Sequence, residues 1–227
     1  LWVLLGAVAA ARLGPERGRY SPRSAWLRAL VYFAACWLVS WLTGVFATIT
    51  TTAPVTGEQV ASAGWWLSAV GCLVVVGIGY GIVWPLGTET HGRPLRPVWV
   101  LAFGLLWGAA EGQLFLSMWS VADRLIGPAW LVVVVTFGAI SVFTGLWHDR
   151  YWDRLVAPEH NITAWNARKV ALCHVPNLAA TLTFLAVYEN ALLFVAFQTL
   201  ALCLSSWFMR FPPPTAAATP QRSATVD

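Results

Sequence analysis

The side chains best suited to chemistry are concentrated between His148 and Asn177. Three of the four histidines of the chain fall in this stretch, together with several acids and amides. Imidazole and carboxylate groups together bind zinc or iron. We expect the ligands of such a metal to be His148, His160 and His174. We expect catalytic roles nearby for Asp149, Asp153, Glu159 and Asn177.

Two other interpretations of this stretch stay open beside a metal site. The same residues can form a metal-free acid–base site, or a solvated loop whose side chains cap helices. Pro158 favours extended backbone at Ala157, so we expect a bend there. Pro176 lacks an N–H and should distort the helix that carries His174 and Asn177. A divalent metal ion, zinc or iron, is therefore the cofactor of the first interpretation only.

Glu111 is a second candidate because it lies near the middle of an apolar helix, in the segment WGAAEGQLF. An acid at that depth is a functional-site hypothesis by default. We expect it to face the interior, to be protonated and to act as a general acid. The alternative is a structural hydrogen bond between helices, for example with Gln113. The glycines Gly104, Gly108 and Gly112 are spaced four apart, which predicts close packing against another helix and no ligand contact.

Four further residues are candidates for contacts with a substrate: His91, Trp107, Asn166 and Lys169. His91 lies in a short polar loop, and Trp107 lies deep enough in its helix to line an apolar cavity. Lys169 can contact an anionic group of a substrate. Its other interpretation is an interfacial cation at the lipid headgroups.

The elements that must position these residues are membrane-spanning helices. The chain has 227 residues, of which 58% are hydrophobic and only 11% charged. Apolar runs at about 25–49, 63–86, 98–121, 129–147, 170–187 and 191–209 approach or exceed the ~20 residues that span a bilayer. The runs do not alternate, so a helical bundle is expected rather than a barrel. The prediction is an all-α, multi-pass domain over residues 1–210, with a disordered tail at 211–227.

The basic residues predict how this bundle is oriented. Alternating spans place thirteen of the fourteen Lys and Arg residues on one side, and only Arg124 on the other. By the positive-inside rule that side is the cytoplasm of a plasma or inner membrane, and it also receives all four histidines and the C-terminus. The net charge of +4 thus reflects orientation and not nucleic-acid binding. Residues 1–11 are apolar and either complete a seventh span or form the apolar part of a signal peptide.

Several site motifs are absent from the sequence. It contains no P-loop, no dinucleotide-binding fingerprint and no nucleophile elbow. Its four cysteines lie in or beside apolar spans without CxxC spacing, so we expect small core residues. The stretch THGRPL, followed by an intramembrane Trp and Glu, resembles small integral-membrane terpene cyclases, which are also short and aromatic-rich. We assign no family.

These observations favour an enzyme over a transporter, because the polar groups gather at one end of the bundle. The leading hypothesis is metal-assisted chemistry on an isoprenoid, sterol or acyl lipid at a cytoplasm-facing pocket. The alternative is a metal-free cyclase or isomerase, with Glu111 or Asp149 as the acid and tryptophans stabilising a cation. A third class is a transporter or a haem-binding membrane subunit. The expected partners are the lipid bilayer and a lipophilic small molecule.

Overall fold

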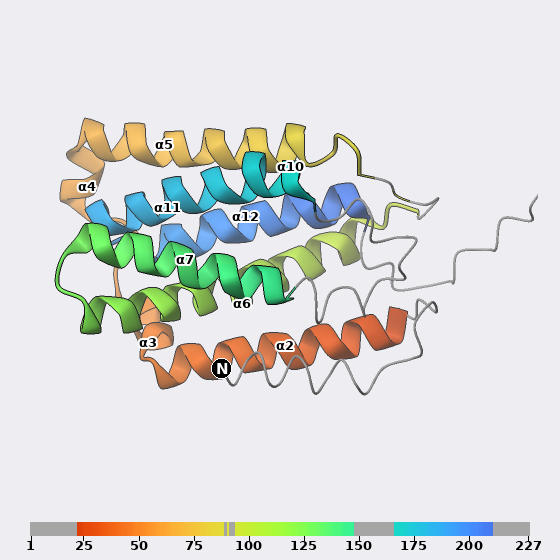
Figure 1. Cartoon of the computed structure of the whole chain (residues 1–227), viewed down its shortest axis with the longest axis horizontal. Helices are drawn as coiled ribbons and strands as arrows, with labels where there is room; N and C mark the ends of the chain where they lie inside the picture. The colour runs from red at the N-terminus through yellow and green to blue at the C-terminus, as the bar shows by residue number, and fades with distance from the viewer. Residues whose placement is uncertain (1–21, 89, 91–93, 148–165, 211–227) are drawn as a thin grey trace, which may run out of the picture.

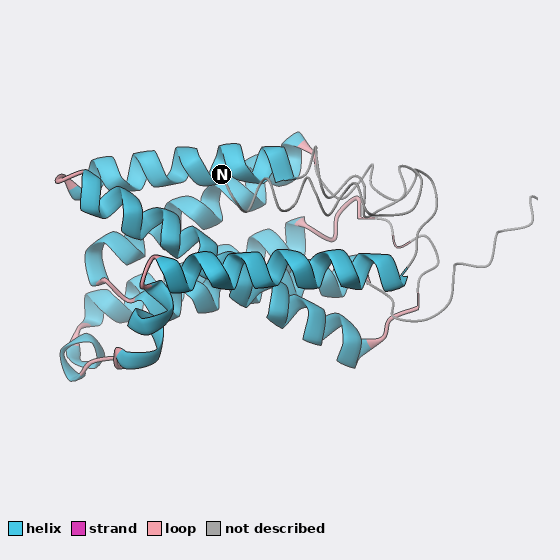
Figure 2. Ribbon diagram, turned by 90° about the horizontal axis from the view of Figure 1, so that it is seen from below, coloured by secondary structure: helices cyan, strands magenta, loops and turns pink. Residues whose placement is uncertain are grey.

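The structure is a computed structural model that describes residues 22–88, 90, 94–147 and 166–210. Every regular element in these ranges is a helix, as Figure 2 shows, so the predicted all-α class is confirmed for this part of the chain. The elements are α2 (Pro22–Leu42), α3 (Val45–Thr51), α4 (Gly57–Ala61), α5 (Ala63–Ile78), η1 (Gly79–Val83), α6 (Pro97–Leu125), α7 (Ala129–Trp147), α10 (Ala167–Lys169), η3 (Val170–His174), α11 (Val175–Tyr188) and α12 (Ala191–Met209). The labels η1 and η3 denote π-helical turns.

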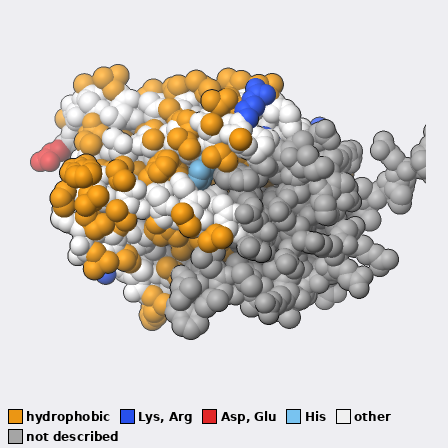
Figure 3. Space-filling model, in the orientation of Figure 1, with side chains coloured by type: hydrophobic (Ala, Val, Ile, Leu, Met, Phe, Trp, Pro, Cys, Tyr) orange, Lys and Arg blue, Asp and Glu red, His pale blue; other side chains and the backbone are white. Residues whose placement is uncertain are grey.

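Within the described ranges, five continuous helical segments are long and apolar enough to cross a membrane, and a bent pair makes a sixth. The continuous segments are Ala63–Val83, Pro97–Leu125, Ala129–Leu146, Ala167–Tyr188 and Ala191–Met209. Many large apolar side chains on α5 and α7 point outward, among them Leu67 and Val142. Figure 3 shows hydrophobic side chains spread over the described surface, with charged ones near its ends. This pattern suits a protein whose solvent is lipid.

The first expected span is not a single straight helix. It bends by 80° between Leu42 and Val45. Gly44 takes a left-handed backbone conformation at the bend, with φ of 79°. The guanidinium of Arg124 donates a hydrogen bond of 2.9 Å to the carbonyl of Thr43. The bend is therefore fixed by a glycine conformation and by a cation at the C-terminal end of α2.

All spans run between the same two ends of the bundle (Figure 1). One end, here called the basic end, holds the start of α2, the start of α6 and the end of α12. It carries Arg96, Arg168 and Arg210. The opposite end holds Arg124 and the turn between α6 and α7. The described loops thus lie on the alternating sides that the sequence predicts.

The predicted glycine stripe packs α6 against α12. A Cβ built on Gly108 would lie 2.4 Å from the Cα of Thr199, and one built on Gly104 would lie 2.7 Å from the Cα of Cys203. Gly112 approaches Val195 in the same way, at 3.2 Å. The two helices run antiparallel, and their backbones approach more closely than side chains would allow. This contact confirms the packing role predicted for the glycines.

A π-helical turn precedes Pro176, where the sequence predicts a distorted helix. Pro176 has no N–H to donate to the carbonyl one turn back, so the hydrogen-bond ladder shifts. The N–H of Val175 reaches the carbonyl of Val170 instead. A second π turn, η1, faces this one, and the thiol of Cys173 donates to the carbonyl of Gly79 at 3.0 Å. The two irregular turns thus join the spans on which Tyr80 and His174 lie.

Candidate functional site

Glu111 faces the interior of the bundle, as predicted, and only 7% of its surface is exposed. The indole N–H of Trp107, one turn earlier on α6, donates to Oε2 of Glu111 at 2.5 Å. Both side chains are buried. A protonated carboxyl can accept such a hydrogen bond on one oxygen and carry its proton on the other. Glu111 and Trp107 therefore form the centre of the candidate site.

The α2 helix supplies the side chains that face Glu111. The hydroxyl of Tyr32 lies beside the Glu111 carboxyl and also beside the thiol of Cys36. Tyr32 is 2% exposed and Cys36 is fully buried. The Glu111 carboxyl is thus enclosed between two helices, and its polar neighbours carry no charge. Such surroundings favour a proton on the carboxyl over a buried anion.

Aromatic rings continue from this centre toward the basic end. The ring centroids of Trp107 and Phe103 are 5.5 Å apart. Phe103 in turn lies 5.7 Å from Phe33 and 5.1 Å from Trp26, both on α2. The faces of aromatic rings attract cations through their quadrupoles. The acid therefore stands at the edge of surroundings that could stabilise a positive charge on an apolar molecule.

A second polar group joins α11 to α12 deep in the bundle. The amide of Asn177 donates to Oε1 of Gln198 at 2.9 Å, and the amide of Gln198 donates to the Thr181 hydroxyl at 3.0 Å. The hydroxyl of Tyr80 lies beside the Asn177 side chain and within electrostatic range of Glu111. Tyr80 is therefore near both polar groups. This group adds a neutral network to the interior, where hydrogen bonds must be satisfied internally.

Lys169 lies inside the bundle at the basic end and is 1% exposed. Its ammonium group donates to the Thr88 hydroxyl at 2.5 Å and lies 4.4 Å from the centroid of the Trp84 ring. Thr88 donates in turn to the carbonyl of Trp84. Trp84 stacks on Tyr80, with centroids 5.6 Å apart. Lys169 is thus packed against η1 rather than extended toward headgroups.

The structure places only some of the candidates from the sequence. His174 is buried and lies one turn from Asn177. Asn166 is exposed and acts as a helix cap, since its side-chain oxygen accepts from the N–H of Lys169 at 3.0 Å. Outside the described residues lie His91, His148, Asp149, Asp153, Glu159 and His160. The metal site predicted on these side chains stays a prediction; the described ranges alone bring no three His, Cys, Asp or Glu residues together around one metal position.

Sequence reasoning missed Tyr32, Cys36, Tyr80 and Gln198 as parts of the site. Gln198 could have been found from the sequence, because a lone amide inside an apolar span indicates a partner on a neighbouring helix. No feature of the sequence marks the two tyrosines. Their hydroxyls meet Glu111 and Asn177 only because of the way the helices pair.

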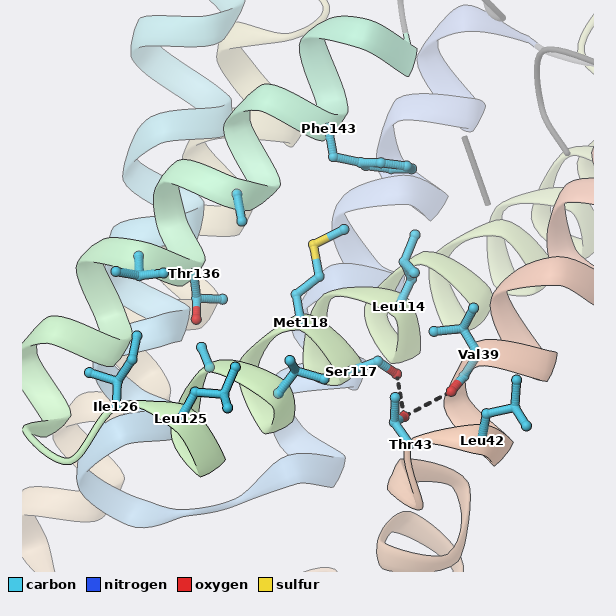
Figure 4. Close-up of a pocket in the computed structure, with 14 residues that line it drawn as sticks. Val39, Leu42, Thr43, Leu114, Ser117, Met118, Leu125, Ile126, Thr136 and Phe143 are labelled. Atoms are coloured by element: carbon cyan, nitrogen blue, oxygen red, sulfur yellow. Dashed lines mark hydrogen bonds between the residues drawn. The ribbon is translucent and has the colours of Figure 1, made fainter. Parts of the chain in front are cut away.

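A cavity of about 530 Å³ lies between α2, α6 and α7 (Figure 4). Its walls are apolar apart from three hydroxyl-bearing residues, Thr43, Ser117 and Thr136. The Thr43 hydroxyl donates to the Ser117 oxygen at 3.0 Å. The lining on α6 begins at Leu114, three residues after Glu111, and runs toward the opposite end of the bundle. This cavity is here called the groove.

No protein-family model matches this chain, and no curated protein or solved structure is detectably similar to it. Three features of the described residues bear on function: the buried acid with its indole donor, the aromatic rings beside it, and the groove that opens one turn away.

Proposed function

We propose that this chain is an integral-membrane enzyme that isomerises or cyclises an isoprenoid-type lipid by proton transfer from Glu111. The observation that supports the proposal is the hydrogen bond of 2.5 Å from Trp107 to a carboxyl buried among aromatic rings. An acid placed at this depth can meet a substrate that dissolves in the bilayer. The membrane helices supply the surroundings that such a substrate needs.

The chemistry begins when Glu111 protonates a carbon–carbon double bond of the substrate. The O–H bond of the acid breaks, a C–H bond forms, and a carbocation remains on the neighbouring carbon. The hydrogen bond from Trp107 stabilises the carboxylate that forms, and the rings of Trp107 and Phe103 stabilise the cation. Loss of a proton from an adjacent carbon back to Glu111 restores the acid. The product has the mass of the substrate.

The basic end faces the cytoplasm in this proposal, because the positive-inside rule assigns it there. The enzyme would lie in a plasma or inner membrane. Its substrate would enter from the lipid rather than from water, since apolar surface covers the described part of the spans.

The test uses the purified protein in lipid nanodiscs prepared in heavy water, with farnesol, geranylgeraniol, squalene and squalene epoxide as substrates. The expected product has one deuterium, because the Glu111 proton exchanges with solvent. The Glu111→Gln variant should lose at least 100-fold in rate, the order expected for removing a general acid. The matched control is Glu58→Gln, an identical change at an exposed position on α4.

Two results would count against the proposal. Full turnover by Glu111→Gln would reduce this acid to a structural role. Loss of turnover on treatment with a chelator, restored by added zinc or iron, would favour the metal-assisted hypothesis on His148, His160 and His174 instead. Unchanged turnover in the chelator supports the metal-free reaction.

A further inference from the structure

We propose that α3 is an interfacial helix, which lies along the boundary between headgroups and acyl chains on the side of the membrane away from the basic end. The surface that it binds is the bilayer itself, and Phe46 is the side chain that contacts the acyl chains just below the headgroups. This placement does not depend on the proposed chemistry of Glu111.

The bend after α2 turns α3 across the axis of the bundle. The two helices meet at 80°, while α2 runs between the two ends of the bundle (Figure 1). A helix nearly at right angles to a membrane-spanning helix runs nearly parallel to the membrane plane. The φ of 79° at Gly44 and the hydrogen bond from Arg124 to the Thr43 carbonyl hold α3 in this direction.

The depth of α3 in the bilayer follows from its neighbours on α6. The Thr43 hydroxyl donates to the Ser117 oxygen at 3.0 Å, so the bend lies beside Ser117. Asp123 and Arg124, six and seven residues later, are exposed and charged, which places them at the headgroups or in water. Seven residues correspond to about 10 Å along a helix. Interfacial helices bury their apolar faces by about 5–10 Å at this boundary, so the depth of α3 fits one.

The composition of α3 and its flanks favours lipid over water. No Asp, Glu, Lys or Arg occurs in residues 43–57. Phe46 is 45% exposed, and Trp41, just before the bend, is 68% exposed. The exposed hydroxyl groups of α3 need no water, because each donates to the carbonyl four residues earlier on the same helix. These are the hydroxyls of Thr48, Thr50 and Thr51.

The backbone of this region excludes the hydrocarbon core. A helix leaves its first N–H groups and its last carbonyls without partners inside the helix. Because α3 has only seven residues, such groups make up most of its backbone. Residues 52–56 then form an irregular and mostly exposed segment. Irregular backbone does not face lipid within the hydrocarbon region, so the headgroup boundary, which offers both water and apolar chains, is the position that fits α3.

Two tryptophans support the same level for the boundary. Trp66 is 49% exposed near the start of α5, and Trp130 is 69% exposed near the start of α7. Both helices begin at the end of the bundle that holds α3 (Figure 1). Exposed Trp side chains gather at membrane–water interfaces. This end of the bundle therefore meets the headgroups near α3.

The experiment measures the depth of single fluorescent labels on the full chain in phosphatidylcholine nanodiscs. Phe46→Cys is coupled to a nitrobenzoxadiazole maleimide. Quenching is measured with iodide in the water, and with lipids that carry a nitroxide either near the headgroup or near the end of an acyl chain. Glu58→Cys, exposed on α4, is the reference for water, and Val74→Cys, exposed in the middle of α5, is the reference for the hydrocarbon core. The unmodified chain, treated with the same reagent, gives the background.

The label on Phe46→Cys should be quenched most by the nitroxide near the headgroup, and it should lose most of the iodide quenching seen for Glu58→Cys. Iodide quenching equal to that of Glu58→Cys would place α3 in water and overturn the inference. Strongest quenching by the nitroxide at the chain end, as expected for Val74→Cys, would place α3 in the hydrocarbon core and also overturn it. Thr50→Cys, exposed one turn later on α3, repeats the test if helix content shows that Phe46→Cys does not fold.

Discussion

Gly108 and Thr199 lie so close that α6 and α12 touch backbone to backbone. A Cβ on Gly108 would be 2.4 Å from the Cα of Thr199, which no real side chain tolerates. Glu111 follows on the same helix, and Gln198 precedes Thr199 on the other. The close contact therefore sets the distance between the helices that carry the acid and the neutral amide network.

Replacing Gly108 by Ala should destabilise the bundle by at least 1–3 kcal/mol, because the new methyl group meets backbone that cannot rotate away. The measurement is unfolding in detergent with increasing SDS. Gly138→Ala on α7 is the matched control, since a Cβ there meets nothing within 4 Å. Equal stability of the two variants would contradict the close packing of α6 on α12.

Trp107→Phe should separate the hydrogen bond from the aromatic ring. The variant keeps a ring beside Phe103 and removes the N–H that reaches Glu111. We expect turnover to fall about 10- to 100-fold, since a hydrogen bond to a developing charge contributes about 1.5–3 kcal/mol. Single-turnover rates and melting temperatures are compared with those of Trp119→Phe, a change at another tryptophan on α6. A loss of stability with an unchanged rate would mean that Trp107 only supports the fold.

The sequence was sufficient for features that depend on local pattern. The length of the apolar runs predicted the membrane spans. The spacing of Gly104, Gly108 and Gly112 predicted a packing surface, and the position of Glu111 in the middle of its span predicted that its side chain faces inward. It was insufficient where the outcome depends on which helices become neighbours. The contact of Tyr32 with Glu111 is of this kind, because nothing in the local pattern of α2 marks that face. The groove likewise exists only once three spans are assembled.

The Asn177–Gln198 pair should contribute to stability as a unit. Gln198→Leu leaves the Asn177 amide buried without its acceptor, and we expect a loss of about 0.5–2 kcal/mol. The double variant Asn177→Leu with Gln198→Leu removes both polar groups and should lose less than the sum of the two single changes. SDS unfolding of all three variants measures the coupling. Strict additivity would show that the 2.9 Å contact has no energetic role.

The orientation of the bundle can be tested with single introduced cysteines. Arg168→Cys lies at the basic end and Glu58→Cys at the opposite end, and both positions are exposed. The native cysteines give little background, because Cys36, Cys72 and Cys173 are buried and Cys203 is partly buried.

The positive-inside rule predicts that an impermeant maleimide labels Glu58→Cys in intact cells. The same reagent should label Arg168→Cys only after the cells are permeabilised, and the unmodified chain is the control in both conditions. The reverse pattern would place the basic end outside the cytoplasm. Lys169, which is packed against Thr88 and Trp84 at the basic end, would then lie on the external side of the membrane.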